Sequence, residues 1–477
     1  MEDIPYDESL IERESVRSGT EYSEFTWRSA NGIEFKGRLP FSVYPPREDT
    51  ELLSSIIEEW PNAIPMNILE IGSGSGVLSC LAAKLSHQVT CCDINPYAVA
   101  STRRLAKEHN LELQCFEGGP GPRNDSNDAQ WGGLGSYDRI LWNLPYLPEP
   151  STKGEKLGPV EEIGTVAEQN FSLYKLMLNR LKKSSLLSKR GIAYFVVSSY
   201  FELNDCVEQA WKNCLSARVL KQLDFGEETI AVVGVWHPFF GEGEFEEHQS
   251  IESTNLHCLN VDTPVGSFVL AHHQTHGRGR GKNTWDSEID SRAMSWVISN
   301  GEKHPKPSFQ FHIGYRLLRL FRSINPTSEF RLKYPNDILV RHQGGRWKKC
   351  CGILIESSSQ GKQNRVVLGI GVNLRASSNQ NGSIFEGEIS FSHWMVHACV
   401  ASLYSNSHAT YDSIELENFQ QIEAEFLDTF RSLYDVTLQN ELVNIEHVNC
   451  DGSLGITKNN GQHLNVAYED VELNLRN

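Results

Sequence analysis

The pattern of apolar residues changes character halfway along this 477-residue chain. The first half alternates short apolar runs, which are typical of buried strands, with longer segments of helical periodicity. This alternation predicts an α/β fold in which a mostly parallel sheet has helices on both faces. The expected strands are 67–71, 88–92, 111–116, 139–142 and 192–198, the expected helices are 77–85, 96–110, 171–187 and 202–215, and a strand pair follows at 219–225 and 229–236.

The alternation stops at residues 237–250, which hold one proline, two glycines and four glutamates. Beyond this segment the pattern indicates antiparallel strands with fewer helices, the clearest at 308–323 and 415–433. The tail predicts short strands separated by Asp-Gly and Asn-Gly pairs, which favour tight hairpin turns. We therefore expect a domain at 1–240, an acidic linker at 241–250, a second domain at 251–432 and a small all-β cap at 433–477.

Composition limits the classes of function. The chain has 44 Lys and Arg against 61 Asp and Glu, a net charge of −17, which argues against a general nucleic-acid coat. It has no apolar stretch approaching the roughly 18 residues that a membrane span needs, so no membrane association is expected. Its acidic start lacks an apolar signal region, and its 11 scattered cysteines include no Cys-x-x-Cys, so we expect reduced thiols and a cytoplasmic location.

A glycine-rich segment lies between the first expected strand and helix of this fold. It reads Glu70-Ile-Gly72-Ser-Gly74-Ser-Gly76, and its glycines permit a tight turn where a ligand can approach the backbone at a helix N-terminus. Asp93 ends the next strand, where its carboxylate can accept hydrogen bonds from ribose hydroxyls. These features alone fit an NAD enzyme equally well.

The end of the strand at 139–142 separates these alternatives. It leads into Asn143-Leu144-Pro145-Tyr146. An Asn carboxamide and a backbone carbonyl can bind the protons of a planar nitrogen group while Tyr covers its flat face, which leaves the nitrogen lone pair directed at a methyl donor. The plain alternative is an Asn-Pro turn, but the order of the three motifs favours a methyltransferase.

Residues 43–236 resemble class I S-adenosylmethionine-dependent methyltransferases of the HemK type, which methylate a glutamine amide in release factors. Tyr44-Pro-Pro-Arg-Glu-Asp-Thr50 looks like the element before that family's first helix. The resemblance implies that S-adenosylmethionine is the cofactor, that a release-factor type of protein is the acceptor, and that Asn143 and Tyr146 are catalytic. It implies that the cofactor contacts Thr50, Glu70, Gly72, Gly74, Gly76, Asp93 and Asn143.

Leu144 departs from the family pattern, because the family usually has proline there. Asn-Leu-Pro-Tyr also occurs in methyltransferases that act on adenine in RNA, so an adenine acceptor in RNA or DNA is an alternative. A further alternative is that this half binds S-adenosylmethionine without catalysis and serves as a docking module.

The densest cluster of glycine and positive charge lies in the second half, at Gly277-Arg278-Gly279-Arg280-Gly281-Lys282. A P-loop is excluded because Asn283, not Ser or Thr, follows the lysine. A disordered Arg-Gly tract fits poorly because the segment is short and runs into Thr284-Trp285. A loop with two guanidinium groups and an ammonium group suits a triphosphate or an acyl phosphate.

Three further segments follow this loop, at 333–337, 349–356 and 369–373. They read Lys-Tyr-Pro-Asn-Asp, Lys-Cys-Cys-Gly-Ile-Leu-Ile-Glu and Gly-Ile-Gly-Val-Asn. In this order they resemble biotin–protein ligases, from about residue 250 to the C-terminus. The resemblance implies an α+β catalytic domain of the class II synthetase type with a C-terminal SH3-like cap, and no operator-binding domain.

The ligase resemblance implies two half-reactions. Biotin first attacks the α-phosphate of ATP to form biotinyl-5′-AMP, and a lysine of a biotin carboxyl carrier protein then attacks this anhydride. Arg278, Arg280, Lys349 and Asp337 are the implied catalytic residues, and Mg²⁺ is expected on the ATP phosphates. The implied biotin and ATP contacts, among which Trp285 is expected to stack on adenine, are Ser253, Thr254, Gln274, Gly277, Arg278, Gly279, Arg280, Trp285, Lys333, Asn336, Lys349, Gly352, Gly371 and Asn373.

Histidines cluster at His272, His273 and His276. A metal site is not expected here, because adjacent residues point to opposite faces of a strand and no cysteine or carboxylate follows at ligand spacing. We therefore predict no protein metal site.

Overall fold

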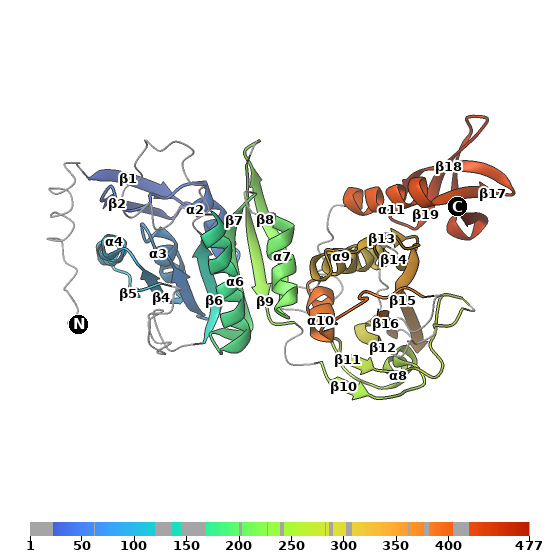
Figure 1. Ribbon diagram of the computed structural model, residues 1–477. Coiled ribbons are helices and arrows are strands. Elements are labelled where there is room, and N and C mark those ends of the chain that lie inside the picture. Colours follow the sequence, from blue (N-terminus) through green and yellow to red (C-terminus); the bar gives the residue numbers. More distant parts are fainter. Residues whose placement is uncertain are drawn as a thin grey trace. The chain divides into compact units, whose positions relative to one another are not determined.

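The computed structural model describes residues 22–61, 63–119, 136–144, 167–199, 203–226, 228–238, 243–281, 283–285, 290–301, 308–360, 363–375, 381–403 and 419–476 (Figure 1). The chain divides after His237 into two compact units, close to the boundary expected after residue 240. Each unit has its own sheet and is described by itself. None of the described helices is long and apolar enough to cross a membrane.

The first unit contains a seven-stranded sheet in the order β5-β4-β3-β6-β7-β9-β8. The pairs among β5, β4, β3, β6 and β7 are parallel, whereas β9 runs antiparallel to both β7 and β8. The predicted parallel sheet and its closing strand pair are thus present. The strands are β3 (Asn67–Ile71), β4 (Gln88–Asp93), β5 (Gln114–Glu117), β6 (Tyr137–Asn143), β7 (Leu187–Ser198), β8 (Ser216–Asp224) and β9 (Thr229–Trp236).

The central strands of this sheet are covered on both faces. Four consecutive residues of β3 and seven of β9 are buried, which requires packing layers on both sides because successive side chains alternate between faces. The helices form two groups, in which α3 contacts both α2 and α4, and α6 contacts α7. Their bounds are α2 (Glu48–Ile57), α3 (Val77–Lys84), α4 (Pro96–Glu108), α6 (Ala167–Lys183) and α7 (Leu203–Lys212).

A hairpin that the sequence pattern did not predict precedes this sheet. Its strands are β1 (Ser23–Arg28) and β2 (Glu34–Leu39), which pair antiparallel. Leu39 packs with Val43 and with Ala98 of α4 in a small apolar cluster. The hairpin therefore fixes the chain that leads into α2, which carries part of the first site.

The second unit has a mixed seven-stranded sheet in the order β10-β11-β12-β16-β15-β14-β13, with only β10 and β11 parallel. The antiparallel character expected beyond residue 250 is present. Its strands are β10 (Phe245–His248), β11 (Phe268–Ala271), β12 (Asp290–Gly301), β13 (Glu329–Lys333), β14 (Asp337–Arg341), β15 (Lys348–Gln360) and β16 (Gln363–Arg375). Its helices are α8 (Thr254–Asn260), α9 (Ser308–Ile324) and α10 (His393–Ala401).

Two sequence expectations differ from this arrangement. The segment 241–250, expected to be a linker, includes strand β10, because its residues pair with β11 along Phe245–His248. His272 and His273 lie beyond the end of β11 at Ala271, so the argument from opposite strand faces does not apply to them. His272 instead contacts Glu247 at 2.8 Å, and His273 contacts Ser250.

The C-terminal part of the second unit is a five-stranded antiparallel sheet in the order β20-β19-β18-β17-β21. Two of its turns contain the expected Asp-Gly and Asn-Gly pairs, where Gly452 and Gly461 have φ of 87° and 81°. An all-β C-terminal part was expected. Its strands are β17 (Tyr434–Leu438), β18 (Glu441–Val448), β19 (Ser453–Lys458), β20 (His463–Ala467) and β21 (Val471–Leu475).

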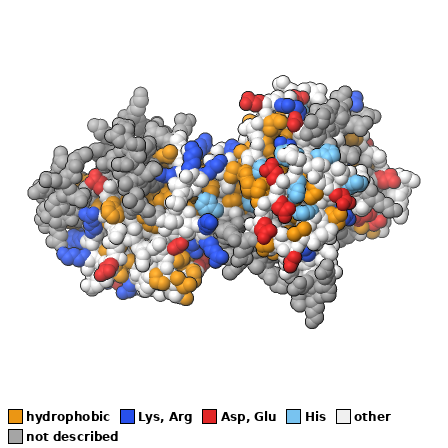
Figure 2. All heavy atoms as spheres, turned by 90° about the horizontal axis from the view of Figure 1, so that it is seen from below, with side chains coloured by type: hydrophobic (Ala, Val, Ile, Leu, Met, Phe, Trp, Pro, Cys, Tyr) orange, Lys and Arg blue, Asp and Glu red, His pale blue; other side chains and the backbone are white. Residues whose placement is uncertain are grey.

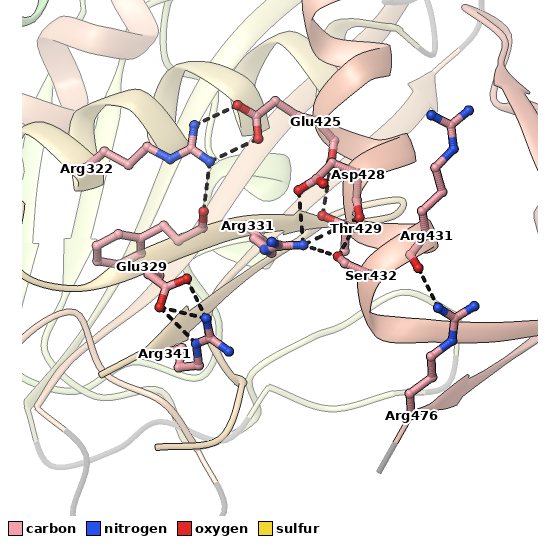
Figure 3. Close-up of polar contacts among 11 residues, drawn as sticks. Arg322, Glu329, Arg331, Arg341, Glu425, Asp428, Thr429, Arg431, Ser432 and Arg476 are labelled. Atoms are coloured by element: carbon pink, nitrogen blue, oxygen red, sulfur yellow. Dashed lines mark hydrogen bonds and ion pairs between the residues drawn. The ribbon is translucent and has the colours of Figure 1, made fainter. Parts of the chain in front are cut away.

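Helix α11 (Phe419–Leu433) joins this sheet to the mixed sheet. Figure 3 shows Arg322 of α9 facing Glu425 and Arg331 of β13 facing Asp428, with closest approaches of 2.6 and 3.0 Å. These pairs are partly exposed, and such pairs contribute only about 0–1 kcal/mol each. The buried ring of Phe426, 5.2 Å from the Tyr334 ring, supplies the apolar part of the contact. Helix α11 thus holds the C-terminal sheet near the residues that follow β13.

Candidate active sites

The glycine-rich turn after β3 is held by backbone hydrogen bonds. Gly72 and Ser73 donate to the Cys92 carbonyl, and Gly74 N donates to Asp93 Oδ2 at 2.9 Å. Gly76 has φ of 83°, and a Cβ there would lie 2.8 Å from Thr102 of α4. Glycine is therefore required for both the backbone conformation and the close approach of α4.

Two carboxyl groups lie beneath this turn. Asp93 Oδ1 also accepts from Asn95 N at 2.8 Å, so both oxygens of Asp93 are tied to backbone amides. Burial raises the pKa of Asp93, although these amides oppose the effect. Burial raises the pKa of Glu70 to about 8, and Ser79 Oγ donates a short hydrogen bond to Glu70 Oε2. Burial therefore favours the protonated form of Glu70.

The side chain of Asn143 at the end of β6 is oriented by α2. Asn143 Nδ2 donates to Asp49 Oδ2 at 2.8 Å, and Tyr44 Oη donates to the same oxygen at 3.0 Å. The other oxygen of Asp49 accepts from Thr50 N and Thr50 Oγ1. Asn143 Oδ1 is buried and accepts no hydrogen bond from any residue in the described ranges. The amide thus presents its carbonyl oxygen for a further donor.

The expected residues of the first site are only partly accounted for. The glycine turn, Asp93, Asn143 and the α2 N-terminus with Thr50 have described positions, whereas Tyr146 lies outside the described residues. Asp49 was not singled out from the sequence, although the segment 44–50 was. Its role depends on a contact with a residue 94 positions away, which no local pattern indicates.

The second unit contains a cavity of about 520 Å³ above the mixed sheet. Of the residues expected to bind biotin and ATP, only Gly277 and Asn373 are not among its lining. The expected residues that line it are Ser253, Thr254, Gln274, Arg278, Gly279, Arg280, Trp285, Lys333, Asn336, Asp337, Lys349, Gly352 and Gly371.

The loop over this cavity is folded back as a short hairpin. Arg278 and Thr284 form an isolated bridge, and Gly279 N donates to the Asn283 carbonyl at 2.9 Å. A Cβ at Gly277 would lie 2.3 Å from the Trp285 carbonyl oxygen, which explains why this residue is glycine although it does not line the cavity. Lys282 lies outside the described residues.

The cavity gathers four cationic side chains, each close to a carboxylate. Arg278 lies 3.0 Å from Glu356, and Lys349 Nζ lies 2.7 Å from Asp337 Oδ1. Lys333 is 3.9 Å from Asp337, and Arg280 forms an ion pair with Glu469. Among the described residues, four cations therefore face three carboxylates, an excess of one positive charge.

The indole of Trp285 lies on the floor of the cavity. A Cβ at Gly371 would lie 2.5 Å from this ring, and one at Gly352 would lie 3.0 Å from it. The two glycines of β15 and β16 therefore leave room for the indole. Lys349 Nζ lies 5.3 Å from the centre of the same ring, a distance typical of a cation–π contact.

A chain of polar side chains extends from α8 to the cationic loop. Thr254 N and Oγ1 donate to Gln274 Oε1, and Ser295 Oγ lies within hydrogen-bond distance of both Thr254 Oγ1 and Asn255 Oδ1, at 2.7 and 2.6 Å. Asn255 Nδ2 donates to Glu356 Oε2 at 2.8 Å. Thr254, Asn255 and Gln274 of this network line the cavity, where they can exchange hydrogen bonds with a polar ligand.

Sequence reasoning missed the contribution of the C-terminal sheet to this cavity. Tyr468 and Glu469 line it, and the guanidinium of Arg280 lies 5.7 Å from the Tyr468 ring. Both residues lie in a short 3-10 helix between β20 and β21, without a recognisable motif. Asn336, which lines the cavity as expected, is held by a hydrogen bond from its Nδ2 to the Ile353 carbonyl.

Comparisons with known proteins match each unit to a family. The methyltransferase small domain matches residues 47–153, and the biotin/lipoate A/B protein ligase family matches residues 247–373. A putative protein N5-glutamine methyltransferase of Methanocaldococcus jannaschii is 35% identical over 210 residues, which cover 43% of this chain and 98% of that protein.

A biotin–protein ligase of Schizosaccharomyces pombe is 32% identical over 140 residues, which cover 26% of this chain but only 22% of that protein. A solved structure of a biotin protein ligase from Aquifex aeolicus, in complex with biotin and ATP, has a TM-score of 0.39 at 19% identity over 49% of this chain and 99% of that one. The resemblances inferred from the motifs are confirmed at the level of family. Through its first unit the chain belongs to the methyltransferase family of the Methanocaldococcus jannaschii relative, and residues 247–373 of its second unit match the biotin/lipoate A/B protein ligase family.

Proposed function

We propose that this chain is a bifunctional enzyme that modifies proteins. The second unit is an ATP-dependent biotin–protein ligase, which forms biotinyl-5′-AMP and transfers biotin to a lysine of a carboxyl carrier domain. The first unit transfers a methyl group from S-adenosylmethionine to a protein glutamine amide. The ligase proposal rests above all on one observation, the cavity that combines four cations with a polar network.

The first ligase step needs positive charge around an α-phosphate. When the biotin carboxylate oxygen attacks this phosphorus, pyrophosphate leaves and negative charge accumulates on the phosphate oxygens. Arg278, Arg280 and Lys349 are placed around one cavity to offset this charge. Each of these side chains can exchange its carboxylate partner for the phosphate, so each cation keeps an anionic partner when the ligand binds.

Mg²⁺ fits this cavity through Asp337. Mg²⁺ on a nucleotide takes one or two protein carboxylates and otherwise phosphate oxygens and water. Asp337 is the carboxylate closest to Lys349 and Lys333, so it is suited to hold the ion against the phosphates. The ion would supply additional charge neutralisation. Lys349, once released from Asp337, would then bridge the biotin carboxylate and the phosphate.

The second ligase step requires that the anhydride be protected from water. The hairpin 277–285 and the C-terminal residues Tyr468 and Glu469 border the same cavity, so together they can cover the adenylate. The amine of the carrier lysine attacks the biotinyl carbonyl carbon, and AMP leaves. Biotin's ureido group is assigned to the polar network of Thr254, Gln274 and Asn255.

The methyltransferase proposal rests on the free carbonyl oxygen of Asn143. Asp49 accepts a hydrogen bond from Asn143 Nδ2, so Oδ1 remains able to accept a hydrogen bond from a planar nitrogen group. S-adenosylmethionine supplies the electrophilic methyl group when bound. Asn143 orients the nitrogen lone pair toward it, and the glycine turn with the buried Asp93 provides amide and carboxylate contacts for the cofactor.

A protein glutamine is the preferred acceptor. The relative from Methanocaldococcus jannaschii, matched over 98% of its length, is described as a putative protein N5-glutamine methyltransferase. A net charge of −17 also disfavours RNA or DNA, whose binding depends on cationic surfaces. A release-factor type of protein is the proposed acceptor. The test must distinguish this proposal from two alternatives, an adenine acceptor in nucleic acid and a docking role without catalysis.

A double-label experiment tests both proposals. The purified chain is incubated with ATP, Mg²⁺, labelled biotin, tritiated S-adenosylmethionine and cell lysate, and the products are treated with protease or nuclease. We expect biotin on a carboxylase-sized band and methyl label that resists nuclease but not protease. Methyl label that is sensitive to nuclease would show that the acceptor is a nucleic acid and not a protein glutamine.

Two variants separate the activities. Asn143→Ala should lose methyl transfer and keep biotin transfer, whereas Lys349→Ala should show the reverse. If wild type and Asn143→Ala give the same methyl label, Asn143 has no catalytic role. If wild type binds S-adenosylmethionine but labels nothing in lysate or in purified release factor, the docking role replaces the methyltransferase. Undiminished pyrophosphate release in Lys349→Ala would remove that lysine from the ligase mechanism.

A further inference from the structure

Three metal-ligating side chains converge where β10 meets α8. Glu246 and His248 are two positions apart in β10, so they share one face of that strand. His257 approaches them from α8. Both histidines direct Nε2 at the same oxygen, Glu246 Oε2, at 3.1 Å for His248 and 2.9 Å for His257. The candidate ligand atoms all lie within 4.8 Å of one another.

The face that carries β10 and α8 is visible in Figure 2, where histidine and acidic side chains gather on the second unit. The three side chains are 34%, 31% and 26% exposed for Glu246, His248 and His257. This exposure gives an ion access from solvent. It also leaves space for water, which must complete the coordination of an ion held by only three protein ligands.

Rigid elements fix these ligands. β10 pairs with β11 along four residues, with Glu246 opposite Val269 and His248 opposite Ala271. Helix α8 is capped by Ser253, whose side chain accepts from Leu256 N, and it packs on β11, β12 and β16. Ligands on a strand and a helix are held more precisely than ligands on loops.

We propose that Glu246, His248 and His257 form a binding site for Zn²⁺ or a similar transition-metal cation. Two imidazole nitrogens and one carboxylate oxygen, with water in the remaining positions, are a donor set that suits such ions. Mg²⁺ and Ca²⁺ prefer oxygen ligands and are expected to bind weakly here. The site is separate from the sequence cluster of His272, His273 and His276.

The bound ion would tie an edge strand to the helix that borders the ligase cavity. β10 is an edge strand that pairs with β11 alone among the described strands, whereas α8 carries Thr254 and Asn255 of the cavity wall. A metal bridge would therefore stabilise the start of the second unit. Metal binding itself does not depend on the proposed ligase activity, so the two proposals can fail independently.

The test measures Zn²⁺ binding to the full chain. Chelator-treated wild type, Glu246→Gln, His248→Ala and His257→Ala are titrated with Zn²⁺ against a competing chromogenic chelator and by calorimetry. Each substitution should either remove one equivalent of bound Zn²⁺ or lower the affinity for Zn²⁺ by more than about 10- to 100-fold. That range is the loss caused by removing a group that only supports a metal ligand, so loss of a ligand itself should cost more. Zn²⁺ should also raise the melting temperature of wild type and not that of the variants.

His272→Ala is the matched control. His272 contacts Glu247, which lies on the opposite face of β10, so this variant removes a nearby histidine–carboxylate pair without touching the proposed ligands. It should bind Zn²⁺ like wild type. Mg²⁺ titration supplies the control for the ion.

Two results would overturn the proposal. The first is that wild type, His248→Ala and His257→Ala bind the same number of Zn²⁺ ions with the same affinity. The second is a Co²⁺ spectrum measured on wild type alone, which does not depend on the folding of any variant. Co²⁺ bound to wild type should show the visible absorption of a four- or five-coordinate site, and a spectrum of six-coordinate hydrated Co²⁺ would exclude the site.

Discussion

Gly371→Ala tests the placement of Trp285 in the ligase cavity. The added Cβ would lie 2.5, 2.7 and 2.9 Å from three indole atoms. Contacts this short cannot persist, so either the indole or strand β16 must move. Since β16 is hydrogen-bonded to β12 and β15 on its two sides, the ring on its loop is the part that yields.

The energetic cost of Gly371→Ala can be taken from the overpacking of well-packed sites, which costs about 1–3 kcal/mol. Because the displaced ring lies on the cavity floor, this cost should appear in ligand binding. At about 1.4 kcal/mol per tenfold change, kcat/KM for adenylate formation should fall by roughly 5- to 150-fold. The melting temperature should change little, since the loop can move without unfolding the sheet.

The assay is pyrophosphate release with biotin and ATP, alongside thermal unfolding. Gly314→Ala in α9 is the control, because its Cβ would lie 3.5 Å from its nearest neighbours, an ordinary contact. It should leave the rate unchanged. Trp285→Phe should partly relieve the defect of Gly371→Ala, so the two changes should be non-additive. Wild-type kinetics in Gly371→Ala, or strict additivity with Trp285→Phe, would refute the proposed position of the indole.

Three further predictions concern charge and proton binding. Asn143→Ala should lower kcat for methyl transfer by about 10²-fold, the loss typical of misoriented reacting groups, and an unchanged kcat would contradict the role of its carbonyl oxygen. Arg280→Ala should weaken adenylate formation by about 1–3 kcal/mol. Glu469→Gln should instead lower KM for ATP by up to about fivefold, because the exposed ion pair that this substitution removes competes with phosphate for Arg280. If the two variants showed equal ATP kinetics, that competition would be excluded. Burial lowers the pKa of His397 to about 3 from 6.5, so the unfolded chain binds more protons between these values and stability must fall as the pH decreases from 6.5 toward 3. The free energy of unfolding should change by up to about 1.4 kcal/mol per pH unit in this range. Urea unfolding of wild type and His397→Gln at pH 7 and 5 tests this, because the variant should lack the contribution of His397 to the pH dependence.

Local sequence patterns predicted much of the fold, because these parts of the fold depend on interactions between residues close together in the chain. Consecutive apolar residues, the Asn95-Pro96 start of α4 and the Asp-Gly turns each depend on neighbours a few positions away. The family motifs also placed most of the cavity lining, since glycine, arginine and lysine occur at fixed spacing on one loop and three strands. These features predicted the two-part architecture and both candidate sites.

Only the tertiary structure decided which distant residues complete those sites. Asp49 reaches Asn143 across 94 positions, and Glu469 reaches Arg280 across 189. Such contacts follow from how strands are ordered and packed, which periodicity does not encode. The same is true of β10, where the acidic composition that suggested a linker is compatible with an edge strand because β10 pairs on one side only. Sequence determined the chemistry available in each unit, and packing determined which of these side chains meet.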